Sequence, residues 1–132
     1  MIVKNFVIKK GSFFEGDTIS KRVMEMQIDE NSFFSVIDMR FATMLDLEFR
    51  TEKRIILLEG REVECDVAGP VIISFGDRSS LGLICVLPKL ERAILGRRAL
   101  MEMDLVVDKV TGELKYKIPE TIFVKTKIKE LS

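Results

Sequence analysis

Strict alternation of apolar and polar residues is the feature that most constrains how this 132-residue chain can fold. Between residues 61 and 67, Val63, Cys65 and Val67 alternate with acidic side chains. Residues 121–129 repeat the pattern, with apolar side chains alternating with lysines. Successive side chains of a strand point to opposite faces of its sheet, so such segments are typical of half-buried antiparallel strands. The sequence therefore predicts a fold that is mostly β.

Turn residues separate these strands at intervals of about ten residues, which favours a closed sandwich or barrel. The expected turns lie at residues 10–11 with 16–17, and at 29–32, 59–60, 68–70, 76–80 and 111–112. Only residues 97–103 carry a helical stripe, so one short helix is expected there. No linker, repeat or low-complexity segment interrupts the pattern, and residues 1–132 are interpreted as a single domain.

Composition excludes several classes of function. The 21 Lys and Arg residues balance 21 Asp and Glu residues, so the chain lacks the basic surplus of a nucleic-acid-binding protein. No apolar run approaches the ~18 residues of a membrane span, and the N-terminus lacks a signal-peptide pattern. We therefore expect no nucleic-acid or membrane partner and a cytoplasmic location.

The absence of histidine removes Ser-His-Asp, Cys-His and histidine-ligated zinc chemistry. Cys65 and Cys85 lie in alternating strand patterns, and we interpret them as small buried core residues rather than as a disulfide or a nucleophile. No metal and no cofactor is expected.

One segment carries a more specific pattern. The run Ala93-Ile94-Leu95-Gly96-Arg97 leads into the expected helix and then into the apolar segment 105–107 and a Thr111-Gly112 turn. This order resembles the C-terminal motif of retropepsin-like aspartic proteases, in particular the archaeal single-domain members. The resemblance implies a closed acid-protease barrel in which Gly96 permits a close approach of two backbones. It implies that Gly96 and Arg97 have structural roles. Arg97 needs an acidic partner, for which Asp66 is one arbitrary candidate.

The same resemblance, which spans about residues 24–116, implies where a site would lie. Asp38 follows an apolar segment and occupies the catalytic position, with one such residue per subunit. Residues 57–63 resemble the flap hairpin, and the implied substrate-binding residues are Leu58, Glu59, Gly60 and Ile94. Aspartic proteolysis needs two carboxylates that share one proton, so a chain with a single candidate implies a homodimer with the two Asp38 side chains meeting on its two-fold axis.

Asp38 is followed by Met39 and Arg40, where the family pattern has Thr or Ser and then Gly. Met39 has no hydroxyl to brace the loop, and an Arg40 guanidinium directed at Asp38 would keep its carboxylate ionised. We therefore expect a retropepsin-like homodimer whose peptidase activity is impaired or lost and which retains a groove for a peptide or protein segment.

Two alternatives remain open at this stage. The chain would be an active aspartic endopeptidase if the Asp38 pair still shared a proton. It would be an unrelated small β-barrel binding module if the motif were a coincidence, and Asp38 would then be an ordinary turn aspartate. Asp46 is a weaker second candidate, interpreted as a solvent-facing strand residue.

Overall fold

The computed structural model describes residues 1–11 and 21–117. The elements follow in the order β1 (Ile2–Lys10), β2 (Lys21–Asp29), β3 (Val36–Asp38), α1 (Met39–Met44), β4 (Phe49–Leu58), β5 (Arg61–Phe75), β6 (Arg78–Leu87), β7 (Ala93–Gly96), α2 (Arg97–Glu102), β8 (Leu105–Val107) and β9 (Leu114–Tyr116). The turn residues predicted at 16–17 and the strand predicted at residues 121–129 lie outside the described residues.

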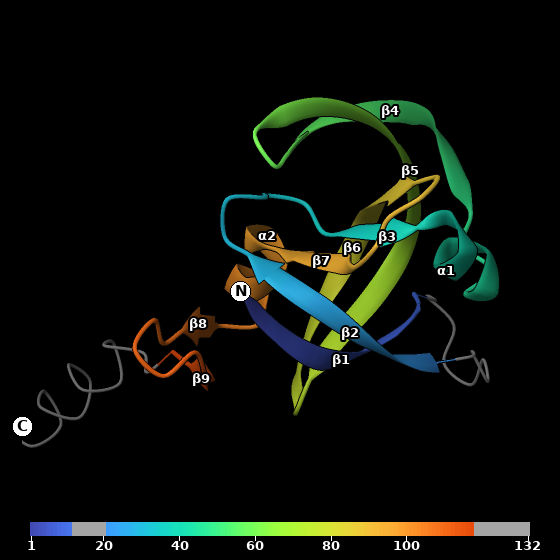
Figure 1. Cartoon of the computed structure of the whole chain (residues 1–132). Helices are drawn as coiled ribbons and strands as arrows, with labels where there is room; N and C mark the ends of the chain where they lie inside the picture. Colours follow the sequence, from blue (N-terminus) through green and yellow to red (C-terminus); the bar gives the residue numbers. More distant parts are fainter. Residues whose placement is uncertain (12–20, 118–132) are drawn as a thin grey trace, which may run out of the picture.

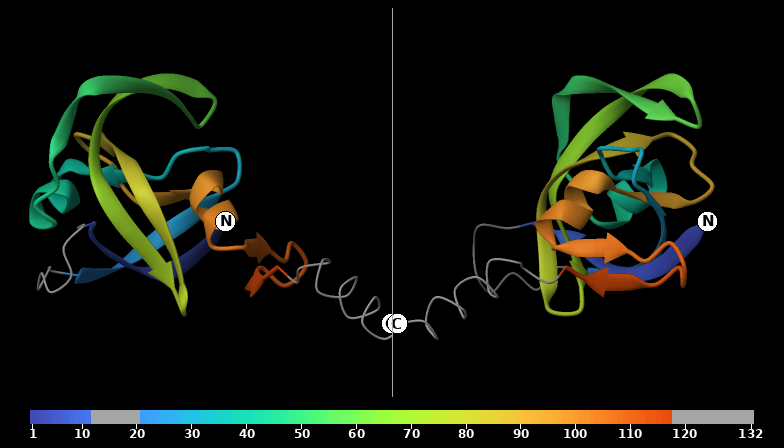
Figure 2. Two further views of the ribbon diagram at one scale, coloured as in Figure 1. Left: turned by 180° about the vertical axis from the view of Figure 1, so that it is seen from behind. Right: turned by 90° about the vertical axis from the view of Figure 1, so that its left-hand side faces the viewer.

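Six strands close into a barrel, which confirms the mostly-β, closed-barrel prediction at that level of detail. Their order is β1-β2-β7-β3-β6-β5, and pairing of β1 with β5 completes the ring. Strand β4 extends the sheet beyond the barrel as the antiparallel partner of β5, and the two arch over β3 and β7 (Figure 1). Strands β8 and β9 form a separate two-stranded sheet, at the opposite end of the molecule from the β4–β5 hairpin (Figure 2).

The barrel strands bury apolar side chains on both faces, and successive residues of a strand point alternately to one face and the other. In β3, Ile37 belongs to the larger cluster of the barrel core, whereas the preceding Val36 belongs to a second, smaller cluster. We call this second set the hairpin cluster; its buried members are Val36, Ile56, Cys65, Cys85, Leu87 and Ile94. Because Ile56 and Cys65 come from β4 and β5, the hairpin covers the outer face of the barrel strands. Both cysteines are free and buried, as predicted.

The predicted hairpin with Glu59 and Gly60 at its tip is confirmed, since these two residues join β4 to β5. The predicted closing hairpin around Thr111-Gly112 is also confirmed, with Val107 opposite Leu114. The helix expected at 97–103 is α2. In the described ranges, no helix combines the length and apolarity needed to cross a membrane.

Three expectations are wrong. The chain forms a second short helix, α1, directly after Asp38, where one helix in total was expected. Residues 68–70 do not form a turn but lie within β5, where the pairing with β6 changes register between Ala68 and Val71 and Gly69 adopts a φ of 126°. Asp46 is exposed, as expected, but it lies after α1 with a φ of 55° rather than in a strand.

Candidate functional site

Asp38 is both the last residue of β3 and the N-cap of α1. Its backbone is extended, with φ −74° and ψ 148°, and its Oδ1 atom accepts a hydrogen bond from the Arg40 N–H at 2.8 Å. A carboxylate at this position accepts a hydrogen bond from an otherwise unpaired helix N–H, and its negative charge is stabilised by the positive end of the helix dipole. The first turn of α1 contains no other acidic residue, so Asp38 alone provides this charge.

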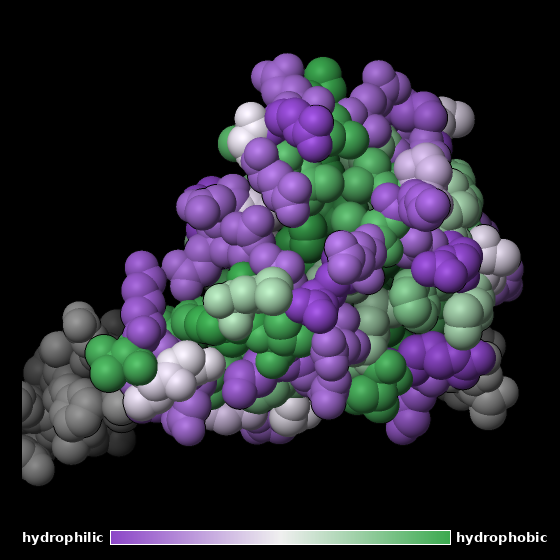
Figure 3. All heavy atoms as spheres, in the orientation of Figure 1, coloured by the Kyte–Doolittle hydropathy of each residue, from purple (hydrophilic) through white to green (hydrophobic). Residues whose placement is uncertain are grey.

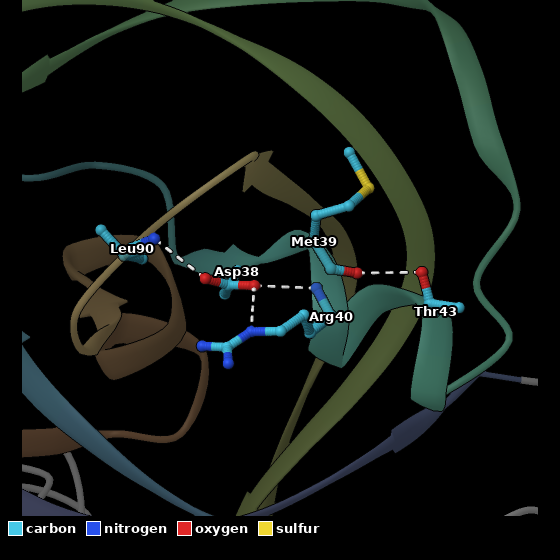
Figure 4. A network of polar contacts seen from close by, with 5 residues as sticks. All are labelled: Asp38, Met39, Arg40, Thr43 and Leu90. Carbon is cyan, nitrogen blue, oxygen red and sulfur yellow. Dashed lines mark hydrogen bonds and ion pairs between the residues drawn. The ribbon is translucent and has the colours of Figure 1, made fainter.

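Both oxygens of the Asp38 carboxylate have donors within the protomer (Figure 4). Oδ1 also accepts from Arg40 Nε at 3.2 Å, and Oδ2 accepts from the Leu90 N–H at 2.9 Å. The side chain of Asp38 is only 3% exposed. The Arg40 and Leu90 backbone N–H groups, helped by the Arg40 guanidinium, lower the pKa of Asp38 against the opposing effect of burial. The carboxylate is therefore ionised and fully engaged.

The residues after Asp38 differ in their orientation. Arg40 turns back to Asp38 and forms the ion pair expected from the sequence, although 80% of its side chain is exposed. The Met39 side chain points away from Asp38 and is partly buried against the barrel core (Figure 4). The nearby hydroxyl of Thr43 donates to the Met39 carbonyl at 3.0 Å, so it is committed to the helix.

The four residues implied for substrate binding separate into two pairs. Leu58 packs against the hairpin cluster, of which Ile94 is a buried member, so the fold brings these two side chains to the same apolar region. Glu59 and Gly60 are exposed at the hairpin tip with φ values of 50° and 78°. Asp38 follows Val36 by two residues on β3 and therefore lies on the face of that strand that the hairpin covers.

Gly96 allows the close backbone approach predicted from the sequence. A Cβ atom on Gly96 would lie 2.5 Å from the carbonyl carbon of Phe34, and the Gly96 N–H donates to Ser35 Oγ at 2.9 Å. Arg97 begins α2, and its guanidinium lies 5.5 Å from the centre of the Phe33 ring. The suggested ion pair between Arg97 and Asp66 is wrong: Asp66 forms its ion pair with Lys53, and the Arg97 guanidinium contacts Phe33 instead.

Sequence reasoning missed Arg54. It lies opposite Cys65 in the β4–β5 ladder, and its side chain therefore shares a face with Cys65, toward the hairpin cluster. The guanidinium carbon is 4.2 Å from the centre of the Phe34 ring, and Nη1 is buried with no hydrogen-bond partner. The signal in the sequence is an arginine in register with Ile56 and Leu58 on one strand face.

Comparison with protein-family models and with curated proteins finds no match. Within residues 1–11 and 21–117, no three His, Cys, Asp or Glu side chains gather closely enough to hold a metal ion. The function is therefore argued from the geometry around Asp38 and the β4–β5 hairpin.

Proposed function

We propose that this chain is a retropepsin-like homodimeric protein that has lost peptidase activity and binds a peptide or protein segment between the β4–β5 hairpin and the barrel. The observation that carries the proposal is the engagement of both Asp38 oxygens by donors of the same protomer. The homodimer is inferred from the family resemblance, which spans about residues 24–116 and includes only one candidate aspartate per chain.

Aspartic proteolysis requires one carboxylate to take a proton from water while its partner donates one. A carboxylate that serves this pair needs a pKa near the working pH and a lone pair facing the water. The pKa of Asp38 is instead lowered, since its charged form accepts hydrogen bonds from Arg40 and Leu90. Its side chain is also enclosed within the protomer. These features favour a structural role for Asp38 over a catalytic one.

The hairpin provides the surface for a ligand. Partly buried apolar side chains border the hairpin cluster, namely Phe34, Leu58, Val63 and Leu90. Figure 3 shows apolar residues in green between the hairpin and the barrel, bordered by hydrophilic ones. Such a surface with a polar rim is typical of sites that bind apolar side chains of a partner.

The test is a peptidase assay between pH 4 and pH 6 with a mixed peptide pool, comparing the wild-type protein with Asp38→Asn. We expect no cleavage by either protein above a no-enzyme control. Cleavage by the wild type that disappears in Asp38→Asn would replace the proposal with the active endopeptidase. Asp46→Asn is the matched control, because Asp46 is an exposed aspartate outside the hairpin cluster.

A further inference from the structure

Arg54 is a cation on the covered face of the β4–β5 hairpin. Two of its neighbours, Ile56 on its own strand and Cys65 directly opposite, are buried and apolar. Arg54 itself is partly buried, and the part of its guanidinium that is cut off from water needs a partner to compensate for the lost hydration.

The protomer provides only part of that compensation. The guanidinium carbon lies over the Phe34 ring, 4.2 Å from its centre, and this cation–π contact stabilises the charge without giving the N–H groups an acceptor. The Nη1 group at its edge is buried and has no acceptor, and it is the one buried side-chain nitrogen or oxygen in the described part of the chain without a partner. No ion pair to Arg54 forms within those residues, and the nearby Asp66 is bonded to Lys53.

The two adjacent thiols do not supply the missing negative charge. Burial raises the pKa of Cys65 and raises that of Cys85 to about 12, so both remain neutral thiols. A neutral thiol is only a weak acceptor. The site therefore offers a cationic donor beside apolar side chains, and its buried Nη1 group lacks an acceptor.

We propose that Arg54 binds the carboxylate of the peptide or protein segment that occupies the space beneath the hairpin. A guanidinium edge matches a carboxylate with two parallel hydrogen bonds, and the contact with the Phe34 ring leaves the edge of the guanidinium available for them. The hairpin cluster then receives an apolar side chain next to the carboxylate. This inference rests on the proposed function and specifies the chemistry of its ligand.

Entry of a ligand requires the hairpin to move, and the topology permits this. Among the described strands β4 pairs only with β5, and it lies outside the closed ring of six strands. Residues 61–65 of β5 pair with β4 and not with β6, so bending of the hairpin at these residues breaks no pairing of the ring. When the hairpin closes again, the ligand carboxylate would accept the hydrogen bond for which Nη1 has no partner in the free protein.

The experiment is an NMR titration of the full-length protein with two pairs of peptides. The first pair is acetyl-leucyl-valyl-leucine and its C-terminal amide, which tests a terminal carboxylate. The second is acetyl-leucyl-glutamyl-leucinamide and its glutaminyl counterpart, which tests a side-chain carboxylate. We expect the acid of at least one pair to bind at least tenfold more tightly than its neutral counterpart, with shifts at residues 54–65. The pair that shows the preference identifies the source of the carboxylate.

The variants then assign the preference to one side chain. Arg54→Met keeps most of the side-chain length and should abolish the preference for the acid. Arg54→Lys should retain only part of it, because lysine cannot form the two-pronged contact. Arg50→Met is the matched control, since Arg50 is an exposed arginine of the same strand, and it should behave as the wild type. The wild-type-like spectrum of each free variant establishes that it is folded.

The failures are distinguishable. Equal binding of acid and neutral peptides, or a preference that persists in Arg54→Met, would overturn the role of Arg54 and leave the proposed groove in place. Absence of binding by all four peptides at millimolar concentration would overturn both proposals.

Discussion

At the scale of the residue, Asp38 joins three parts of the chain through one side chain. It ends β3, caps α1 and holds the backbone of Leu90 in the loop before β7. Replacement by Asn keeps the size of the side chain but places an amide donor against one of the N–H groups that the carboxylate accepts. A buried unpaired donor costs about 1–3 kcal/mol, so we expect Asp38→Asn to lower the free energy of unfolding by about 2 kcal/mol in urea denaturation.

The same variant predicts a change in acid sensitivity. Because the folded protein lowers the pKa of Asp38 below its ordinary 3.8, the unfolded chain binds more protons, and this part of the stability is lost as the pH falls through the folded pKa. Asp108 behaves alike, since Lys115 and the Thr111 and Val110 N–H groups lower its pKa to about 2. Asp38→Asn should therefore flatten the decline in stability below about pH 4 without abolishing it. A decline unchanged in this variant, or one equally flattened in Asp46→Asn, would contradict the role of Asp38.

Replacement of Arg54 should stabilise the protein, whereas replacement of Asp38 should destabilise it. Arg54→Met removes the stacking on Phe34, worth about 0.5–1 kcal/mol, but it also removes a buried unpaired donor that costs about 1–3 kcal/mol. We expect the free energy of unfolding of the ligand-free protein to rise by about 1 kcal/mol in urea denaturation. A loss of more than about 1 kcal/mol would mean that Nη1 has an acceptor in the free protein.

At the scale of the element, the junction of β7 and α2 depends on the absence of a side chain at Gly96. A Cβ atom there would meet the carbonyl group of Phe34 at 2.5–2.6 Å, and backbone cannot yield as a flexible side chain does. We expect Gly96→Ala to destabilise the fold by about 3 kcal/mol, measured by thermal or urea unfolding. Gly60→Ala is the control, because it meets no atom within 4 Å and costs about 1 kcal/mol for its φ of +78° alone. Equal losses in the two variants would contradict the importance of the close approach.

The elements also show what the sequence could and could not reveal. Alternation predicts strands such as β5 because burial on one face repeats every second residue. The turn residues Glu59 and Gly60 predict the hairpin between β4 and β5. Helix α1 escapes detection because it has six residues and buries only Ala42, so no helical stripe exists. Its one signal is the aspartate at the N-cap, and the family resemblance assigns that same aspartate to the catalytic position. Arg54 was missed because the burial of its side chain depends on which face of β4 is covered, and the sequence pattern does not show this.

At the scale of the whole molecule, period-two alternation states which face of a strand is buried but not which strand lies beside it. The closure of β1 on β5 and the parallel pairs β2–β7 and β3–β6 therefore could not be derived from the pattern. These pairings place β4 outside the ring, and they bring Leu58 and Ile94, which are far apart in the sequence, to one apolar region. This apolar region is thus a product of topology rather than of any local motif.

The proposed homodimer should form whether or not Asp38 is catalytic. Met101 on α2 and Val106 on β8 are 65% and 43% exposed and line the same surface depression, which gives an apolar patch of the kind that subunit contacts cover. Both Asp38 oxygens are satisfied within one protomer, so association should not depend on that side chain. Sedimentation equilibrium should give twice the chain mass of 15.1 kDa for the wild type and for Asp38→Asn alike. A single-chain mass at all concentrations would refute the dimer, and a dimer lost only in Asp38→Asn would mean that the two carboxylates meet after all.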